Sequence, residues 1–151
     1  MTTGTAIKTM LQLATPTTRQ IMILEWGFSV DDPPGADGVV ELIDTNVAAT
    51  VTAHVASGVV NLDPNGATTL LTLGTSATGY TSTSEGVVTA ARPLDAVSLS
   101  SVSGESGLCY VRTFMPDDRP IVAVSRFLRV RATTPTTAAD MRCWVTFQEV
   151  G

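Results

Sequence analysis

The run Gln20–Val30, QIMILEWGFSV, constrains the fold most strongly, because Glu25 is its only charged residue. In an extended strand, successive side chains point to opposite faces. One face of this strand would carry Met22, Leu24, Trp26, Phe28 and Val30, and the other would carry Ile21, Ile23 and Gly27. The run therefore predicts a strand buried on both faces, either between two layers of structure or between the protein's own core and a partner.

Several other segments share this apolar and β-branched character. They are Val39–Thr45, Gly86–Arg92, Leu108–Met115, Ile121–Ala132 and Ala139–Val150. We expect Ile121–Ala132 to be the longest strand. We also expect Gly86–Arg92 to end at Pro93, because proline cannot donate a hydrogen bond to a neighbouring strand.

Two segments allow more than one interpretation. The alternation in Thr5–Leu13 fits an ordinary edge strand, which we favour, or an N-terminal arm that reaches a neighbouring molecule. Asn46–Gly58 alternates as a strand does, and we favour that structure. Its alanines and its Ser57-Gly58 ending would also suit a short helix closed by a glycine.

Turn-forming residues separate these segments. The connections are Ala14–Arg19, Asp31–Gly38, Asn61–Gly86 and Leu94–Gly107. The third connection is rich in Thr, Ser and Gly and carries an apolar island of Leu70, Leu71 and Leu73. We expect it to be an excursion, with a short hairpin as one option, that packs on a neighbour or faces solvent.

Seven or eight strands without an amphipathic helix predict an all-β fold. We expect a single-domain β-sandwich with two long loops, and a jelly roll is one strand topology that fits this pattern. Residues 1–19 would form the N-terminal strand or arm and its turn, and residues 20–151 would form the sandwich.

The composition favours a subunit of an assembly. Of 151 residues, 44% are hydrophobic and only 15% are charged, and the mean hydropathy is +0.25. A net charge of −5 without a basic run argues against nucleic-acid binding, which needs clustered cations. No segment reaches the roughly 20 apolar residues of a membrane span, and the N-terminus lacks the pattern of a signal peptide. We therefore expect assembly in the cytoplasm, without membrane or nucleic-acid partners.

Catalytic and metal-binding patterns are weak. His54 is the only histidine, so a histidine-dependent nucleophile would have to use it, and a structural role is the better interpretation. Cys109 and Cys143 could pair if their strands were neighbours, but two reduced, buried thiols are favoured. The Asp31-Asp32, Asp37 and Asp117-Asp118 clusters suit solvated turns better than a calcium site. We expect no enzyme activity, cofactor or metal.

Trp144 and three arginines are better candidates for contacts. Along Ala139–Val150, Met141, Cys143, Val145 and Phe147 would face inward and Arg142, Trp144, Thr146 and Gln148 outward. Trp144 could then anchor an interface or be covered by the protein's own Asn61–Gly86 loop. The arginines of Ile121–Ala132 could pair with a neighbouring subunit, or with Glu25 or Glu41 of the same chain. They are Arg126, Arg129 and Arg131.

Three stretches carry a family resemblance. LQLATPTTRQIMILEWGFSV at Leu11–Val30, VELIDTNVAATVTAHVASGV at Val40–Val59 and AVSRFLRVRATTP at Ala123–Pro135 together resemble small virion structural proteins of tailed bacteriophages that infect actinobacteria and related hosts. The resemblance runs from about Ile7 to Glu149. It contains no catalytic signature, and it is weakest in the two long loops.

The resemblance implies a decoration (cement) protein on the capsid exterior that binds the major capsid protein at junctions between capsomers and forms a homotrimer. Minor capsid and tail roles stay open. The alternative is a tail or surface module that recognises a host glycan or receptor, with Trp144, Tyr80 or the Asn61–Gly86 loop as the carbohydrate-binding candidates. The interface candidates are Ile7, Leu11, Trp26, Leu70, Leu71, Arg126, Arg129, Arg131 and Trp144.

Overall fold

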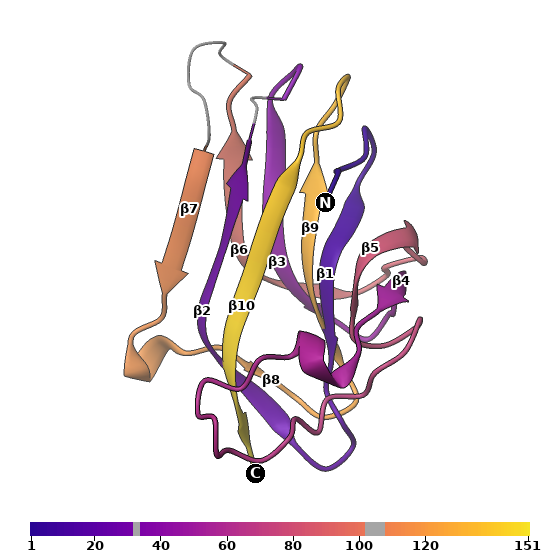
Figure 1. The fold of residues 1–151 in the computed structure, drawn as a ribbon. Coiled ribbons are helices and arrows are strands. Elements are labelled where there is room, and N and C mark those ends of the chain that lie inside the picture. The colour runs from indigo at the N-terminus through magenta and orange to yellow at the C-terminus, as the bar shows by residue number, and fades with distance from the viewer. Residues whose placement is uncertain (32–33, 102–107) are drawn as a thin grey trace.

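Two antiparallel β-sheets face each other in the computed structural model, which describes residues 1–31, 34–101 and 108–151 (Figure 1). The strands are β1 (Lys8–Ala14), β2 (Gln20–Val30), β3 (Gly38–Thr45), β4 (Thr50–Ala53), β5 (Gly79–Ser84), β6 (Ala91–Leu99), β7 (Leu108–Thr113), β8 (Ile121–Val122), β9 (Phe127–Thr133) and β10 (Met141–Val150). The larger sheet has the order β4-β5-β1-β9-β3-β6. The smaller has the order β10-β2-β7, with β8 also beside β2. The predicted β-sandwich is confirmed.

In residues 1–31, 34–101 and 108–151, the helical content consists of two short 3-10 helices, η1 (Ala56–Gly58) and η2 (Pro116–Asp118). Within the described residues, neither these nor any other helix has the length and apolar character needed to cross a membrane.

β2 forms the centre of the smaller sheet, as its apolar run requires. Opposite β10, its register shifts between Glu25 and Ile23, so that Leu24 is an extra residue in a β-bulge. The bulge changes which residues point inward, and Ile23 and Trp26 are both fully buried. The outer face is only half-buried in the single chain. Burial of both faces is therefore wrong for the chain alone, and cover by a partner stays a prediction.

The core lies between the sheets. Trp26 and Phe28 of β2 pack with apolar residues of the larger sheet, including Leu42, Leu128 and Val130. All five side chains have at most 1% of their surface exposed. Close packing of this kind holds two sheets at one fixed spacing.

The N-terminal segment forms a strand, as predicted, but its predicted position at a sheet edge is wrong, and so is the alternative of an arm. β1 pairs with β5 on one side and with β9 on the other, so it is an interior strand and neither an edge strand nor an arm. The residues before it lie along the start of β10. There the Met141 amide donates to the Met1 carbonyl at 2.7 Å, and the Thr3 amide donates to the Ala139 carbonyl at 2.9 Å.

The strand predicted at Gly86–Arg92 instead begins at Ala91, and β6 continues through Pro93 into the segment that we expected to be flexible. The register shift opposite β3 leaves Leu94 as an extra residue. β6 is the edge strand of its sheet, where a missing N–H and a bulge disturb only one neighbour. Residues 102–107 of that predicted connection lie outside the described residues.

The predicted long strand Ile121–Ala132 is two strands in different sheets. β8 pairs with β2, and β9 lies between β1 and β3. Between them Ser125 has φ = 55°, a left-handed conformation that redirects the chain. The apolar alternation continues across this break, which is why the sequence suggested one strand.

Both interpretations of Asn46–Gly58 are partly right, because β4 and η1 share the segment. Asn61–Gly86 ends in β5, which pairs with β1 and β4, so it is not a hairpin of its own. The excursion predicted at Asn61–Gly86 lies at residues 54–78 instead, between β4 and β5, because β5 takes up the end of the predicted segment.

Candidate interaction surfaces

The excursion between β4 and β5 carries apolar side chains that point into solvent. We call them the excursion surface. It consists of Val55, Val60, Leu62, Leu70 and Leu73, with exposed fractions from 36% at Leu73 to 81% at Leu62. Figure 1 shows the excursion crossing the end of the sandwich where β10 and the C-terminus lie. Exposed apolar side chains grouped on one segment are typical of a protein contact site.

Specific bonds hold the excursion against the sandwich. The Thr69 hydroxyl and the Leu70 amide both donate to Glu149 Oε1, at 2.5 and 2.9 Å. The Thr72 amide donates to the Ala14 carbonyl at 3.0 Å, and Leu71 is buried in the core with 4% of its surface exposed. The segment is therefore attached to the sandwich on both sides of Leu70, which fixes the position of that side chain.

The tip of the excursion is built from polar turns. Asn61 accepts a hydrogen bond from the Asp63 amide at 3.1 Å and donates from Nδ2 to the Ala67 carbonyl at 2.9 Å. The Gly66 amide donates to the Asp63 carbonyl at 2.9 Å. These local bonds satisfy the backbone, so Leu62 stays at the surface without a core contact of its own.

Trp144 lies on the outer face of the smaller sheet, across β2. A Cβ at Gly27 would come within 2.5 Å of Trp144 Cζ2 and 2.6 Å of the Tyr110 carbonyl oxygen, so only glycine leaves room for the indole. Trp144 Nε1 donates to Glu25 Oε1 at 3.2 Å. The side chain is half-buried by its own sheet. Its expected role as an interface anchor stays a prediction.

The three arginines are paired within the chain. Arg126 Nε lies 2.6 Å from Asp44 Oδ1, and Arg131 Nη2 lies 2.5 Å from Glu41 Oε1. Glu41 was one of the two intrachain partners expected from the sequence. Arg129 pairs with a third carboxylate, Glu85.

Arg129 is fully buried. Its Nε and Nη2 donate to Thr9 Oγ1 at 2.9 and 2.6 Å, and its Nη1 donates to the Val47 carbonyl at 3.2 Å. Burial lowers the pKa of the guanidinium, and the charge of Glu85 opposes that shift. These partners satisfy a buried charge on the outer side of the larger sheet, so Arg129 is a structural residue.

The sequence did not suggest a polar contact that joins the two sheets. Asp95 of β6 accepts hydrogen bonds from Trp26 Nε1 at 2.9 Å and from the Tyr110 hydroxyl at 2.8 Å. Its other oxygen lies 2.9 Å from Arg112 Nη1. Burial alone would raise the pKa of Asp95, but the hydrogen bonds from Tyr110, Trp26 and Arg112 outweigh it and hold the pKa below its ordinary value.

Three predicted interface residues do not face a partner. Trp26 and Arg129 have no exposed surface, and Leu71 has 4%. Each fills the interior of the single chain, so these assignments are wrong. Ile7 and Leu70 are exposed at 40% and 51%. Leu11 is half-buried. The sequence missed other exposed apolar residues, among them Val55, Val60, Leu62, Val87, Val111 and Met115.

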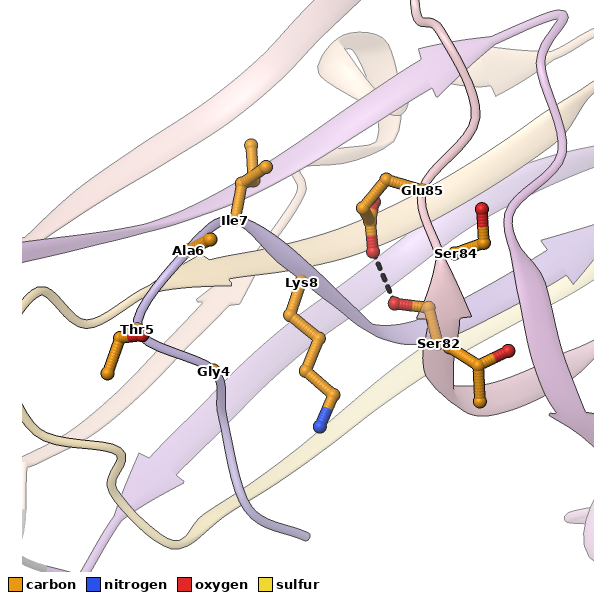
Figure 2. A pocket seen from close by; sticks show the side chains of 9 residues that line it. Gly4, Thr5, Ala6, Ile7, Lys8, Ser82, Ser84 and Glu85 are labelled. Carbon is orange, nitrogen blue, oxygen red and sulfur yellow. Dashed lines mark hydrogen bonds between the residues drawn. The ribbon is translucent and has the colours of Figure 1, made fainter.

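An open hollow of about 330 Å³ lies between the segments 4–8 and 82–85. Figure 2 shows Lys8 and Ile7 on opposite sides of their segment and the Glu85 carboxylate directed at Ser82. Lys8 Nζ donates to the Thr2 carbonyl at 3.0 Å. The charged groups at this hollow are therefore used by the protein's own structure.

His54 packs on Tyr80, with ring centroids 5.0 Å apart. Burial lowers the pKa of His54, which keeps the ring neutral at pH 7. Among the described residues, no three His, Cys, Asp or Glu side chains lie close enough to hold a metal ion. Asp32 of the first aspartate cluster lies outside those residues.

The two cysteines are unpaired, and β2 separates their strands. Cys143 lies opposite Phe28 and faces the core, where burial raises its pKa to about 12. Cys109 lies opposite Ser29 on the outer face and is exposed. The prediction of two buried thiols is therefore wrong for Cys109.

Comparisons of the chain with protein-family models, with curated proteins and with solved structures found no significant match.

Proposed function

We propose that this chain is a structural protein of a phage virion that binds the outer surface of the shell formed by the major capsid protein. It would bind at junctions between capsomers and stabilise the shell. The observation that carries the proposal is the excursion surface, which holds apolar side chains in solvent at one end of the sandwich. The family resemblance of Leu11–Val30 and the two later stretches supplies the class of partner.

The free energy that one such contact can supply is modest, so it suits a protein that binds in many copies to one shell. Burial of one Val or Leu side chain contributes about 1.5–3 kcal/mol. Val60 and Leu62 expose 78% and 81% of their surfaces, so most of that free energy is available to a partner. An array of identical contacts must be broken together when the shell opens, and this multiplies a modest gain per copy.

The attachment of the excursion suits this role. Bonds to Glu149 of β10 and to the Ala14 carbonyl of β1 connect the excursion to both sheets. These bonds order the part of the excursion around Leu70 in advance, which lowers the entropy cost of ordering the loop at an interface.

A binding assay with purified shells of the cognate major capsid protein tests the proposal. Leu62→Asp and Val60→Asp should each weaken binding by about tenfold or more, since 1.4 kcal/mol corresponds to a factor of ten. Val87→Asp is the matched control, because Val87 is 80% exposed but lies outside the excursion. Unchanged binding of both excursion variants would contradict the proposal, as would an equal loss in the control.

A further inference from the structure

β7 is an unpaired edge of the smaller sheet. It pairs with β2 from Leu108 opposite Val30 to Thr113 opposite Glu25, and no strand in the described part of the chain pairs with its other side. The backbone N–H and C=O groups along that side are a template for another strand. Val111 is 50% exposed on the outer face, and Leu108 is 38% exposed.

The other sheet edges carry features that hinder strand addition over at least part of their length. β6 contains Pro93 and the bulge at Leu94. β4 has four residues, and its register with β5 shifts twice. β10 is already met at its start by residues 1–3, through the bridge between Thr2 and Asp140. β7 has six residues in regular register and none of these features.

We propose that β7 pairs with β7 of a second copy of this chain, antiparallel about a two-fold axis, so that the two smaller sheets become continuous. In such a pair, each free backbone N–H of one β7 lies opposite a free C=O of the other β7. Two identical strands can therefore satisfy each other's backbone hydrogen bonds. This inference does not rest on the proposed function, and it replaces the homotrimer implied by the family resemblance with a dimer.

The charges of β7 favour a second copy. The chain carries a net charge of −5, so most surfaces of two copies repel each other. β7 has no acidic residue, and the charge of its one cation, Arg112, is balanced by Asp95 within the chain. The stretch Leu108–Val111 is uncharged. Leu108–Val111 of two copies can therefore meet without an acidic side chain of either stretch at the contact.

Disulfide trapping tests the pairing, with Cys109 as a native probe. A two-fold axis perpendicular to the sheet keeps outer-face residues opposite outer-face residues, where Cβ atoms lie about 4.5–5.5 Å apart. Two probes keep the native cysteine: Cys109 alone, and Cys109 with Val111→Cys. The other two are built on Cys109→Ser: Val111→Cys alone, and Val111→Cys together with Thr113→Cys. They cover the four registers centred on residues 109, 110, 111 and 112. Gln148→Cys on Cys109→Ser is the control, on the outer face of β10.

We expect sedimentation of the unmodified protein to give twice the 15.8 kDa monomer mass. Oxidation should give a covalent dimer in at least one β7 probe, and none in the control. Val111→Lys should return the protein to a monomer while its circular dichroism is unchanged, because lysine at an edge opposes strand addition. A monomer at every concentration would overturn the inference. So would a trimer, or a dimer that no β7 probe cross-links.

Discussion

Trp26 of β2 and Asp95 of β6 connect the two sheets through a hydrogen bond of 2.9 Å from the indole Nε1 to the carboxylate Oδ2. The indole is fully buried and packs at a tilt against Phe28 and edge-on against Tyr110, with ring centroids 5.8 and 5.5 Å away. Asp95 thus accepts the hydrogen bonds of an otherwise apolar aromatic cluster. Its bonds to Tyr110 and Arg112 hold the edge strand β6 against the edge strand β7.

Asp95→Ala should lower the free energy of unfolding by about 1–3 kcal/mol. The substitution leaves the buried Trp26 Nε1 without an acceptor, and an unsatisfied buried donor costs about that much. Urea denaturation followed by tryptophan fluorescence measures the change. Asp117→Asn is the control, since Asp117 is exposed in η2. Equal stability of Asp95→Ala and the wild type would contradict the assigned role.

The contribution of Asp95 should depend on pH. Its pKa in the folded state lies below the ordinary value of 3.8, so the unfolded chain takes up this proton more readily than the folded one. The stabilisation is therefore complete above that ordinary value and is lost as the pH falls through the lower folded pKa. The stability difference between the wild type and Asp95→Asn should be constant near neutral pH and should narrow in strong acid. A gap that widens on acidification would contradict this sign.

His54 should make stability fall in weak acid. Burial lowers its pKa below the ordinary 6.5, so the unfolded state binds more protons in the interval below that value. Stability then rises with pH up to about 6.5 and is level above it. His54→Gln should remove this component, as measured by urea midpoints across the pH range. An unchanged profile in the variant would assign the dependence to other groups.

Arg129→Met should lower the free energy of unfolding by about 3–5 kcal/mol, because it leaves the Glu85 carboxylate without its cation. Arg92→Met is a control for a surface pair. Arg92 also meets a carboxylate, Asp44 at 3.0 Å, but its side chain is 52% exposed, so its loss should cost about 1 kcal/mol or less. The double variant Arg129→Met/Glu85→Gln should recover part of the loss. Equal costs for the two arginines would show that burial does not decide their contribution.

Gly27→Ala should destabilise the smaller sheet by about 1–3 kcal/mol, the usual cost of overpacking. The new methyl group would meet the Trp144 ring at 2.5 Å and the Tyr110 backbone oxygen at 2.6 Å. Gly27→Ala/Trp144→Leu should recover only part of the loss, since the backbone contact remains. Full recovery would show that Trp144 alone requires a glycine there.

Local alternation predicted the strands that keep one regular period, and it failed where the chain changes direction. Most of β10 follows its sequence pattern, and Cys143 and Trp144 face the sides that it predicts. β6 was missed because Pro93 and Asp95 resemble a loop, although an edge strand tolerates both. The break between β8 and β9 depends on the positive φ of Ser125, and the apolar pattern around this residue does not predict that angle.

The surfaces were harder to predict than the strands. Arg129 is interior because Glu85, 44 positions earlier in the chain, folds over the same face, and spacing along the sequence carries no such information. The excursion was predicted as a segment, but Leu71 is buried and Leu62 exposed because hydrogen bonds to β1 and β10 fix one part of it and not the other.

The proposed role in a capsid can be tested most directly by the amount and location of the protein in purified particles. Quantitative mass spectrometry should find it in a fixed, high ratio to the major capsid protein, and particle imaging should place the sandwich on the outer shell with residues 55–73 against the capsomers. A few copies per particle, or density confined to the tail, would contradict the account.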